Sequence, residues 1–224
     1  CTNRKSWIIL STRFVDKTQL SKIDISPLNT ILNIDTDKQT VILEPMVTVG
    51  MATRALNPMG WTLACTLELM DATVGGLCIA TGMTTHSHKV GLIQETVLWY
   101  DVVVATGAVV RCSATENAEL FYALPWSHGT LGFVVALELK LVRCKPYVKL
   151  EYRPHFTMAS YCKDLRALSC TDPEPHADFI EATIYSRNEA VVTVGRFSEA
   201  PRGAEAAKIN RLGLWFKPWW FKHT

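Results

Sequence analysis

The stretch TLGFVVALELKLV, residues 130–142, constrains the fold most, because apolar and charged side chains alternate along it. Four apolar residues fall on one face of an extended strand, namely Val135, Leu137, Leu139 and Leu141, and the charged residues between them fall on the other. A period of two is typical of a strand with one face against a core and the other toward water. The chain is therefore expected to build a sheet that is covered on one side.

Two other regions predict β-hairpins. In TILNIDTDKQTVILEP, residues 30–45, two β-rich runs flank the turn-forming residues 35–38. In VLWYDVVVATGAVVRC, residues 97–112, one strand ends near Thr106 and Gly107 and a second strand follows. The first part of the chain is thus expected to be rich in strands.

Helix signals lie between these strands. Thr48 precedes VGMATRAL, residues 49–56, and can cap a helix there. Ser113 and Glu116 have the spacing of a capping box ahead of the run NAELFYAL, residues 117–124. We therefore expect one helix after each of the two side-chain caps.

Lys145 and Pro146 mark the predicted boundary between two domains, 1–145 and 146–224, because the pattern changes there. Beyond it we expect a strand at 148–152, a helix capped by Thr157 with apolar residues at helical spacing, and strands at 179–186 and 190–197. This order is typical of the start of an α+β layer. The predicted fold class is α+β.

Composition excludes several classes of protein. The net charge is +2, so nothing predicts a nucleic-acid partner. The seven cysteines contain no CxxC pair, which argues against a zinc ribbon and favours reduced, mostly buried thiols. No apolar run reaches the roughly 18 residues of a membrane span. The chain starts at Cys1 and stops inside the second domain, so we expect it to be a fragment.

The segment ATVGGLCIATGMTTHSHKVGL, residues 72–92, is the main candidate site. His86 and His88 suggest a metal, but no nearby residue has convincing spacing for the further ligands, so no metal is predicted. Clustered glycines let a backbone approach an anion or a flat ring, and threonine hydroxyls add donors. A buried tight turn explains the glycines equally well, so the residues alone leave both interpretations open.

Other catalytic motifs are weak or absent. Ser127 and His128 are adjacent, and adjacent side chains rarely face each other; no GxSxG sequence accompanies them. A Walker A loop and the GxGxxG nicotinamide fingerprint are both missing from the sequence.

The order of motifs resembles the PCMH-type FAD-binding domain of the vanillyl-alcohol-oxidase superfamily. Four pieces carry the resemblance in the family's order: VILEPMVTVG, DATVGGLCIATG, YDVVVATGAVVRC and SATENAELFYALPWSHGTLGFVVALELKLV. The resemblance implies a two-subdomain flavin-binding fold, incomplete at its N-terminus, followed by the start of an α+β substrate (cap) domain. Within the superfamily, GWTLACTLEL, SHKVGL, KPYVKLEYRP and WFKPWWFKH are similar to the Diminuto/seladin family of sterol reductases.

This resemblance implies a cofactor site and a reaction. The residues implied to contact FAD are Thr73, Val74, Gly75, Gly76, Leu77, Cys78, Ile79, Ala80, Thr81, Gly82, Met83, Thr84, Thr85, Gly132 and Val134. FAD is expected to bind non-covalently, and NADPH to supply electrons that reduce the C24–C25 double bond of a sterol side chain. Four residues are chemically able to donate the proton, Glu68, His88, Lys89 and Tyr100, and none is preferred.

Family members are anchored in the endoplasmic reticulum membrane, so the resemblance also implies membrane association through a segment outside this chain. One departure favours an alternative. CTNRKSW, residues 1–7, stands where the family's phosphate-binding loop reads roughly CTGRPGW. A degenerate or truncated non-catalytic homologue, and a flavin-dependent oxidase of another substrate, therefore remain alternatives to the reductase.

Overall fold

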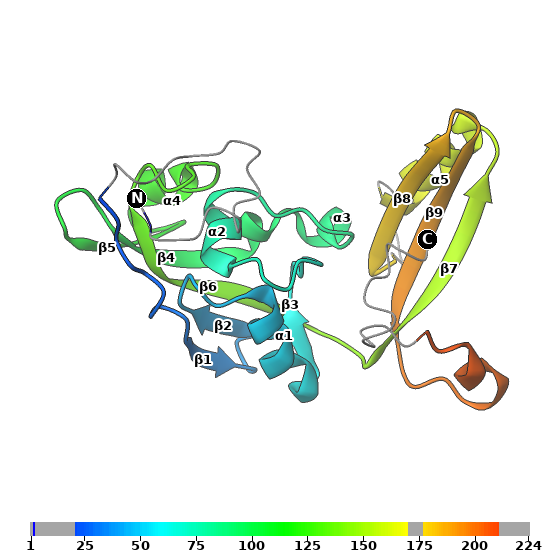
Figure 1. Ribbon diagram of the computed structural model, residues 1–224, viewed down its shortest axis with the longest axis horizontal. Coiled ribbons are helices and arrows are strands. Elements are labelled where there is room, and N and C mark those ends of the chain that lie inside the picture. The colour runs from blue at the N-terminus through cyan, green and yellow to red at the C-terminus, as the bar shows by residue number, and fades with distance from the viewer. Residues whose placement is uncertain (1, 3–20, 170–176, 211–224) are drawn as a thin grey trace.

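The computed structural model describes residues 2, 21–169 and 177–210, and it confirms the α+β class (Figure 1). One sheet has the order β1-β2-β6-β4-β5, with β3 also paired to β6, and a second has the order β7-β9-β8. The strands of the first sheet are β1 (Ile31–Asp35), β2 (Thr40–Leu43), β3 (Trp61–Leu63), β4 (Val97–Val103), β5 (Val109–Ser113) and β6 (Phe133–Arg143). Those of the second are β7 (Tyr147–His155), β8 (Phe179–Ser186) and β9 (Glu189–Ser198).

Short helices connect the strands. They are α1 (Val49–Leu56), η2 (Asn57–Met59), α2 (Val74–Ile79), α3 (Ser87–Val90), η3 (Ile93–Thr96), α4 (Ala118–Ala123), α5 (Met158–Ser169) and η4 (Gly203–Lys208). No helix in the part of the chain that the structure describes is long and apolar enough to cross a membrane.

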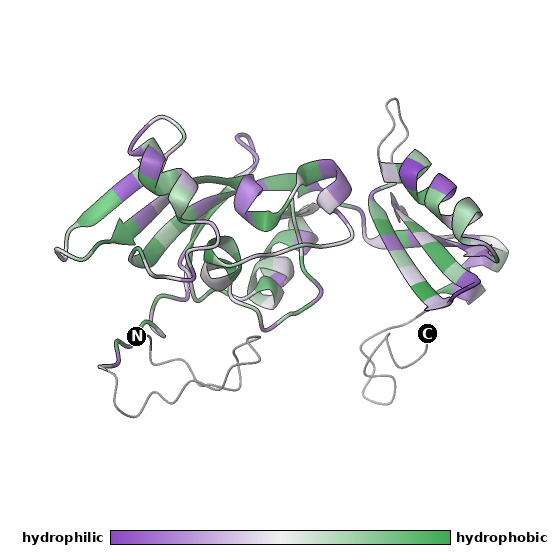
Figure 2. Cartoon of the chain, turned by 90° about the horizontal axis from the view of Figure 1, so that it is seen from above, coloured by the Kyte–Doolittle hydropathy of each residue, from purple (hydrophilic) through white to green (hydrophobic). Residues whose placement is uncertain are grey.

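Strand β6 is the centre of the first sheet. It pairs antiparallel with β2, β3 and β4. Leu137, Leu139 and Leu141 are 0%, 0% and 3% exposed, whereas Lys140 is exposed. The predicted alternation is confirmed at these positions. It is wrong at Val135, which is half-buried while Val134 is buried, because the pairing of β6 with β4 shifts register there. Apolar and polar residues both occur along the strands and along α5 (Figure 2).

Both predicted hairpins are present. Strands β1 and β2 pair around the turn at 35–38, where Asp35 Oδ1 accepts hydrogen bonds from the N–H groups of Asp37 (3.1 Å) and Lys38 (2.9 Å). Strands β4 and β5 pair from Trp99 opposite Ser113 to Val103 opposite Val109. In the β1–β2 hairpin, the carboxylate of Asp35 accepts hydrogen bonds from the backbone of its own turn, which explains why this polar sequence forms a tight turn.

One helix cap was predicted correctly and one was not. Thr48 Oγ1 accepts a hydrogen bond from Met51 N–H (3.2 Å) at the start of α1. Ser113 instead ends β5, and its Oγ accepts from Glu116 N–H (3.1 Å) within a turn. Helix α4 begins only after Asn117, which has a φ of 47° and donates to the Arg111 carbonyl. Asn117 tolerates this left-handed backbone and so separates the turn from the helix.

The second sheet has its own small core, because α5 covers one of its faces. Tyr161 and Ala177 pack there against Ala190, Val192 and Val194 of β9. The predicted cap of α5 is confirmed, since Thr157 Oγ1 accepts from Ser160 N–H (3.2 Å). Residues 144–146 join the two sheets. We call the part before them the first lobe and the part after them the cap lobe.

Candidate functional site

The glycine-rich segment folds as helix α2, a turn over 80–86, and helix α3, rather than as one loop. The N–H groups of Val74 and Gly75 donate to the carbonyls of Val47 (2.9 Å) and Pro45 (3.0 Å). A Cβ on Gly75 would lie 2.4 Å from Pro45 Cβ, so only glycine allows this contact. Five of the predicted FAD-contacting residues therefore belong to the buried half of α2: Thr73, Val74, Gly75, Leu77 and Cys78.

The second half of the segment reaches the surface. Gly76, Ile79, Ala80, Thr84 and Thr85 are half-buried, and Thr81 and Met83 are exposed. Within the described residues, the N–H groups of Thr81, Gly82 and Met83 donate no hydrogen bond to the chain. Gly82 itself is buried against Ile93, where a Cβ would lie 2.5 Å from Cγ2.

The turn 125–132 lies against the end of α2. The His128 N–H donates to the Ile79 carbonyl (2.9 Å), although the two residues are far apart in sequence. Trp126 and His128 have φ values of 67° and 51°, a strained conformation for residues other than glycine. A Cβ on Gly132 would lie 2.6 Å from the Val103 carbonyl oxygen, and Val134 is buried in β6 beside Val102. Such strain often accompanies a ligand site.

These two segments fit a flavin nucleotide on their exposed side. Unbonded backbone N–H groups at 81–83 suit phosphate or ring carbonyl oxygens. The exposed side chains of Met83, Trp126 and Leu131 offer apolar contact for a flat ring system. The buried glycines, by contrast, are explained by packing within the protein. Residues 80–85 of the predicted site, together with the neighbouring turn 126–132, of which only Gly132 was predicted, are therefore the residues that can touch a cofactor.

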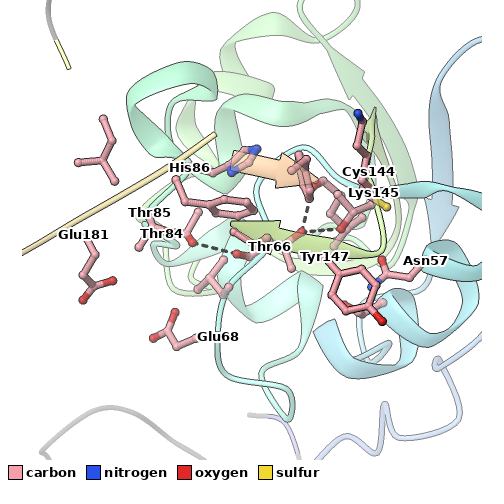
Figure 3. A pocket seen from close by; sticks show the side chains of 18 of the residues that line it. Asn57, Thr66, Glu68, Thr84, Thr85, His86, Cys144, Lys145, Tyr147 and Glu181 are labelled. Atoms are coloured by element: carbon pink, nitrogen blue, oxygen red, sulfur yellow. Dashed lines mark hydrogen bonds between the residues drawn. The ribbon is translucent and has the colours of Figure 1, made fainter. Parts of the chain in front are cut away.

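A cavity of about 710 Å³ lies between the two lobes (Figure 3). Glu68 and Glu181 lie at one end and Asn57 and Tyr147 at the other, with Thr66 between them. Its apolar walls are Leu63, Leu67 and Met83 from the first lobe and Pro146, Val148, Phe179 and Phe197 from the cap lobe. Apolar walls with a few polar groups are typical of a small-molecule site.

His86 lines this cavity and was not predicted as a site residue. It is 6% exposed, and its ring lies 4.5 Å from that of Phe179 and 5.9 Å from that of Phe197, centroid to centroid. Burial lowers the pKa of His86 to about 4, and its buried Nδ1 has no hydrogen-bond partner among the residues that the structure describes. The imidazole is therefore neutral near pH 7. Both phenylalanines come from the cap lobe, and no local pattern pairs them with His86.

The four predicted proton donors lie in different surroundings. Glu68 lines the cavity. Tyr100 is fully buried in the core, where burial raises its pKa and its hydroxyl donates to the Cys78 carbonyl (3.4 Å). His88 and Lys89 bond to the cap lobe instead. Within the described residues no group of three potential metal ligands occurs.

Comparison with known proteins defines the class. Residues 11–113 match the family model of the FAD binding domain. This match places the first part of the chain in the class of FAD binding domains.

The particular family follows from whole-length similarity. The chain is 43% identical to the delta(24)-sterol reductase of Homo sapiens and 38% identical to that of Pisum sativum, in each case over 100% of this chain. This similarity over the whole chain confirms the resemblance to sterol reductases seen in its sequence. The chain spans about 42% of the length of the human relative and 41% of the pea relative. L-gulonolactone oxidase of Bos taurus is 28% identical over 54% of this chain and 27% of its own length.

Proposed function

We propose that this chain is part of an enzyme that reduces the C24–C25 double bond of a sterol side chain, with non-covalent FAD and with NADPH as electron donor. The observation that carries the proposal is 43% identity to a delta(24)-sterol reductase along the entire chain. The resemblance also supports a place at the endoplasmic reticulum membrane.

Residues 80–85 and 126–132 would hold the FAD. The N–H groups of Thr81, Gly82 and Met83 would bind its oxygens, and the strained turn at Trp126 and His128 would position the ring. FAD, when bound there, supplies the means to pass hydride from a nicotinamide to a carbon–carbon double bond. Thr73 to Ile79 and Val134 would support this surface from behind.

The cavity between the lobes would take the substrate. An isolated alkene develops little charge to stabilise, so the protein contributes mainly by orienting it and by placing a proton donor. Leu67, Phe179 and Phe197 would bind the apolar body of a sterol. Among the four candidate donors, Glu68 is the one that faces this cavity, so it is the acid that the proposal favours.

Cofactor binding tests the proposed FAD surface. Met83 is 72% exposed, and Met83→Asp would place a negative charge beside the proposed flavin nucleotide. We expect FAD affinity, measured by quenching of flavin fluorescence, to fall about tenfold or more. Val109→Asp is the matched control, because Val109 is also apolar and 62% exposed but lies on β5. Equal affinity in both variants would contradict the proposed FAD surface.

The reaction is tested by mass spectrometry of a Δ24 sterol incubated with protein, FAD and NADPH. We expect the product to gain two hydrogens, and Glu68→Gln to slow the step. If the protein stays colourless with excess FAD and leaves the sterol unchanged, the proposed function is wrong.

A flavin-dependent oxidase is the second candidate, favoured by the similarity to L-gulonolactone oxidase over 120 residues. It predicts oxygen consumption with an aldonolactone and no reduction of a sterol. The same protein preparation distinguishes the two functions.

A further inference from the structure

The two lobes meet at a second place besides the linker 144–146. The Ile180 N–H donates to the Thr85 carbonyl (2.8 Å), and His88 Nε2 lies 2.8 Å from the Ala177 carbonyl oxygen. A carbonyl can only accept, so Nε2 carries the proton of that imidazole. Lys89 Nζ lies 3.1 Å from Asp178 Oδ1. We call residues 85–89 and 177–180 the docking contact.

Asp178 is the residue on which the docking contact converges. Its Oδ1 accepts from Lys89 of the first lobe, and its Oδ2 accepts from the Phe197 N–H (2.8 Å) near the end of β9. One carboxylate thus joins the first lobe to two strands of the cap sheet. The side chains of Lys89 and Asp178 are 31% and 25% exposed, so this charge-assisted bond is partly shielded from water.

The docking contact directly continues the proposed FAD surface. Thr84 Oγ1 donates to the Thr66 carbonyl (2.9 Å), and Thr84 N–H donates to Ser87 Oγ (3.0 Å) at the start of α3. The next residue, Thr85, supplies the carbonyl that binds Ile180. The same short segment therefore carries unbonded N–H groups at 81–83 and the attachment of the cap lobe at 85–89.

We infer that Asp178 is a positioning residue, which couples the placement of the cap lobe to the conformation of the FAD-binding segment 81–85. Through its bond to Lys89 it holds the cap sheet over the cavity, and thereby sets the spacing between Phe179 and the first lobe. Binding at the segment and docking of the cap then favour each other, because such coupling is reciprocal. The inference rests on the proposed function only for the identity of the ligand.

Hydrogen exchange of the full chain tests the coupling. Asp178→Asn removes the charge that binds Lys89 but keeps an oxygen that can accept from Phe197. We expect the Ile180 amide to exchange about tenfold faster or more. Lys89→Met should do the same without touching the cap lobe, so loss of cap folding is not the cause.

Asp164→Asn is the matched control. Asp164 also holds two partners, Arg153 (3.1 Å) and His155 (3.1 Å), but both lie inside the cap lobe. This variant should leave the protection of Ile180 within about twofold of wild type. If Asp178→Asn and Lys89→Met likewise leave that protection unchanged, the inference is overturned.

Addition of FAD gives the second readout. In wild type FAD should slow exchange both at 81–86 and at 177–180, whereas in the Asp178→Asn variant it should slow exchange at 81–86 alone. Equal slowing at 177–180 in the variant would overturn the coupling. If FAD protects nothing in any variant, the proposed cofactor site fails, while exchange without FAD still decides the role of Asp178.

Discussion

The imidazole of His86 packs against two rings of the cap lobe, and its buried Nδ1 has no partner within the described part of the chain. Burial is the main cause of its lowered pKa; Asp178 opposes this effect and Lys89 and His88 add to it. A neutral imidazole suits the aromatic surroundings, and an imidazolium would lose its hydration there. His86 therefore makes the contact between the lobes sensitive to acid.

This sensitivity predicts a pH dependence. The pKa of His86 is about 4 in the folded chain against an ordinary 6.5, so between these values the unfolded chain binds more protons. The free energy of unfolding should therefore fall as the pH falls from 6.5 toward 4. His86→Phe should lose this part of the dependence and remain folded at pH 7. Denaturant titrations at several pH values measure both.

The control for this experiment is His128→Asn, because His128 is exposed and asparagine tolerates its φ of 51°. That variant should keep the pH dependence of wild type. An identical pH profile for His86→Phe would show that His86 does not titrate as described.

Among the elements, α5 holds the cap lobe together, because it is the helix that covers the small core of the cap sheet. Its first turn depends on Thr157, whose Oγ1 accepts from Ser160 N–H. Arg153 and His155 of β7 bind Asp164 on the same helix. The helix is thus fixed at its start by a cap and at Asp164 by an ion pair with Arg153 and a contact with His155.

Thr157→Ala should destabilise the cap lobe by about 1 kcal/mol, the usual cost of losing a side-chain cap. Thr157→Ser should restore most of it, because serine keeps the accepting oxygen. Ser113→Ala gives the contrast: Ser113 does not cap α4, so the helix signal of that region should be retained. Circular dichroism during thermal unfolding measures all three, and equal losses in the two threonine variants would contradict the capping role.

Local sequence predicted those elements whose signals act over a few residues. The alternation over 137–141 in β6, the turn at 35–38 and the caps Thr48 and Thr157 all act between near neighbours, and each is confirmed. The order of motifs identified the flavin family. The departure CTNRKSW, apart from Thr2, and the matching piece WFKPWWFKH lie outside the described residues.

The features that the local sequence did not predict depend on residues that are far apart in the chain. Gly75 is needed because Pro45 lies against it, and Gly82 because Ile93 does, so glycines that suggested a cofactor loop largely serve packing. His86 contacts Phe179 only once the cap lobe packs against the first lobe. Contacts between residues that are far apart in sequence produce no periodic pattern in it. The full FAD surface and the proton donor stay predictions for the same reason.

At the scale of the whole molecule, the described residues form two hydrophobic cores rather than one. The larger core is in the first lobe, with Leu137 and Tyr100 at 0% exposure, and the smaller in the cap lobe, with Val192 at 0%. The lobes are joined by the linker and the docking contact. A cavity created by a substitution in one core should therefore destabilise mainly the lobe that contains that core.

Leu137→Ala should destabilise the first lobe by about 2–5 kcal/mol, and Val192→Ala the cap lobe by about 2 kcal/mol. We expect each to lower protection from hydrogen exchange mainly within its own lobe, on either side of residues 144–146. A uniform loss of protection along the chain after either substitution would mean that the two lobes unfold as one unit.

The position of β6 in the chain has a consequence for biosynthesis. Strand β2 ends at Leu43, yet β6, with which it pairs, begins only at Phe133. Strands β3 and β4 also pair with β6 and are also made before it. At a synthesis rate of about 5–20 residues per second, β2 exists for roughly 5–20 seconds before its neighbour is made. During that interval the nascent chain exposes apolar strand edges. These edges are the surface that a chaperone would bind.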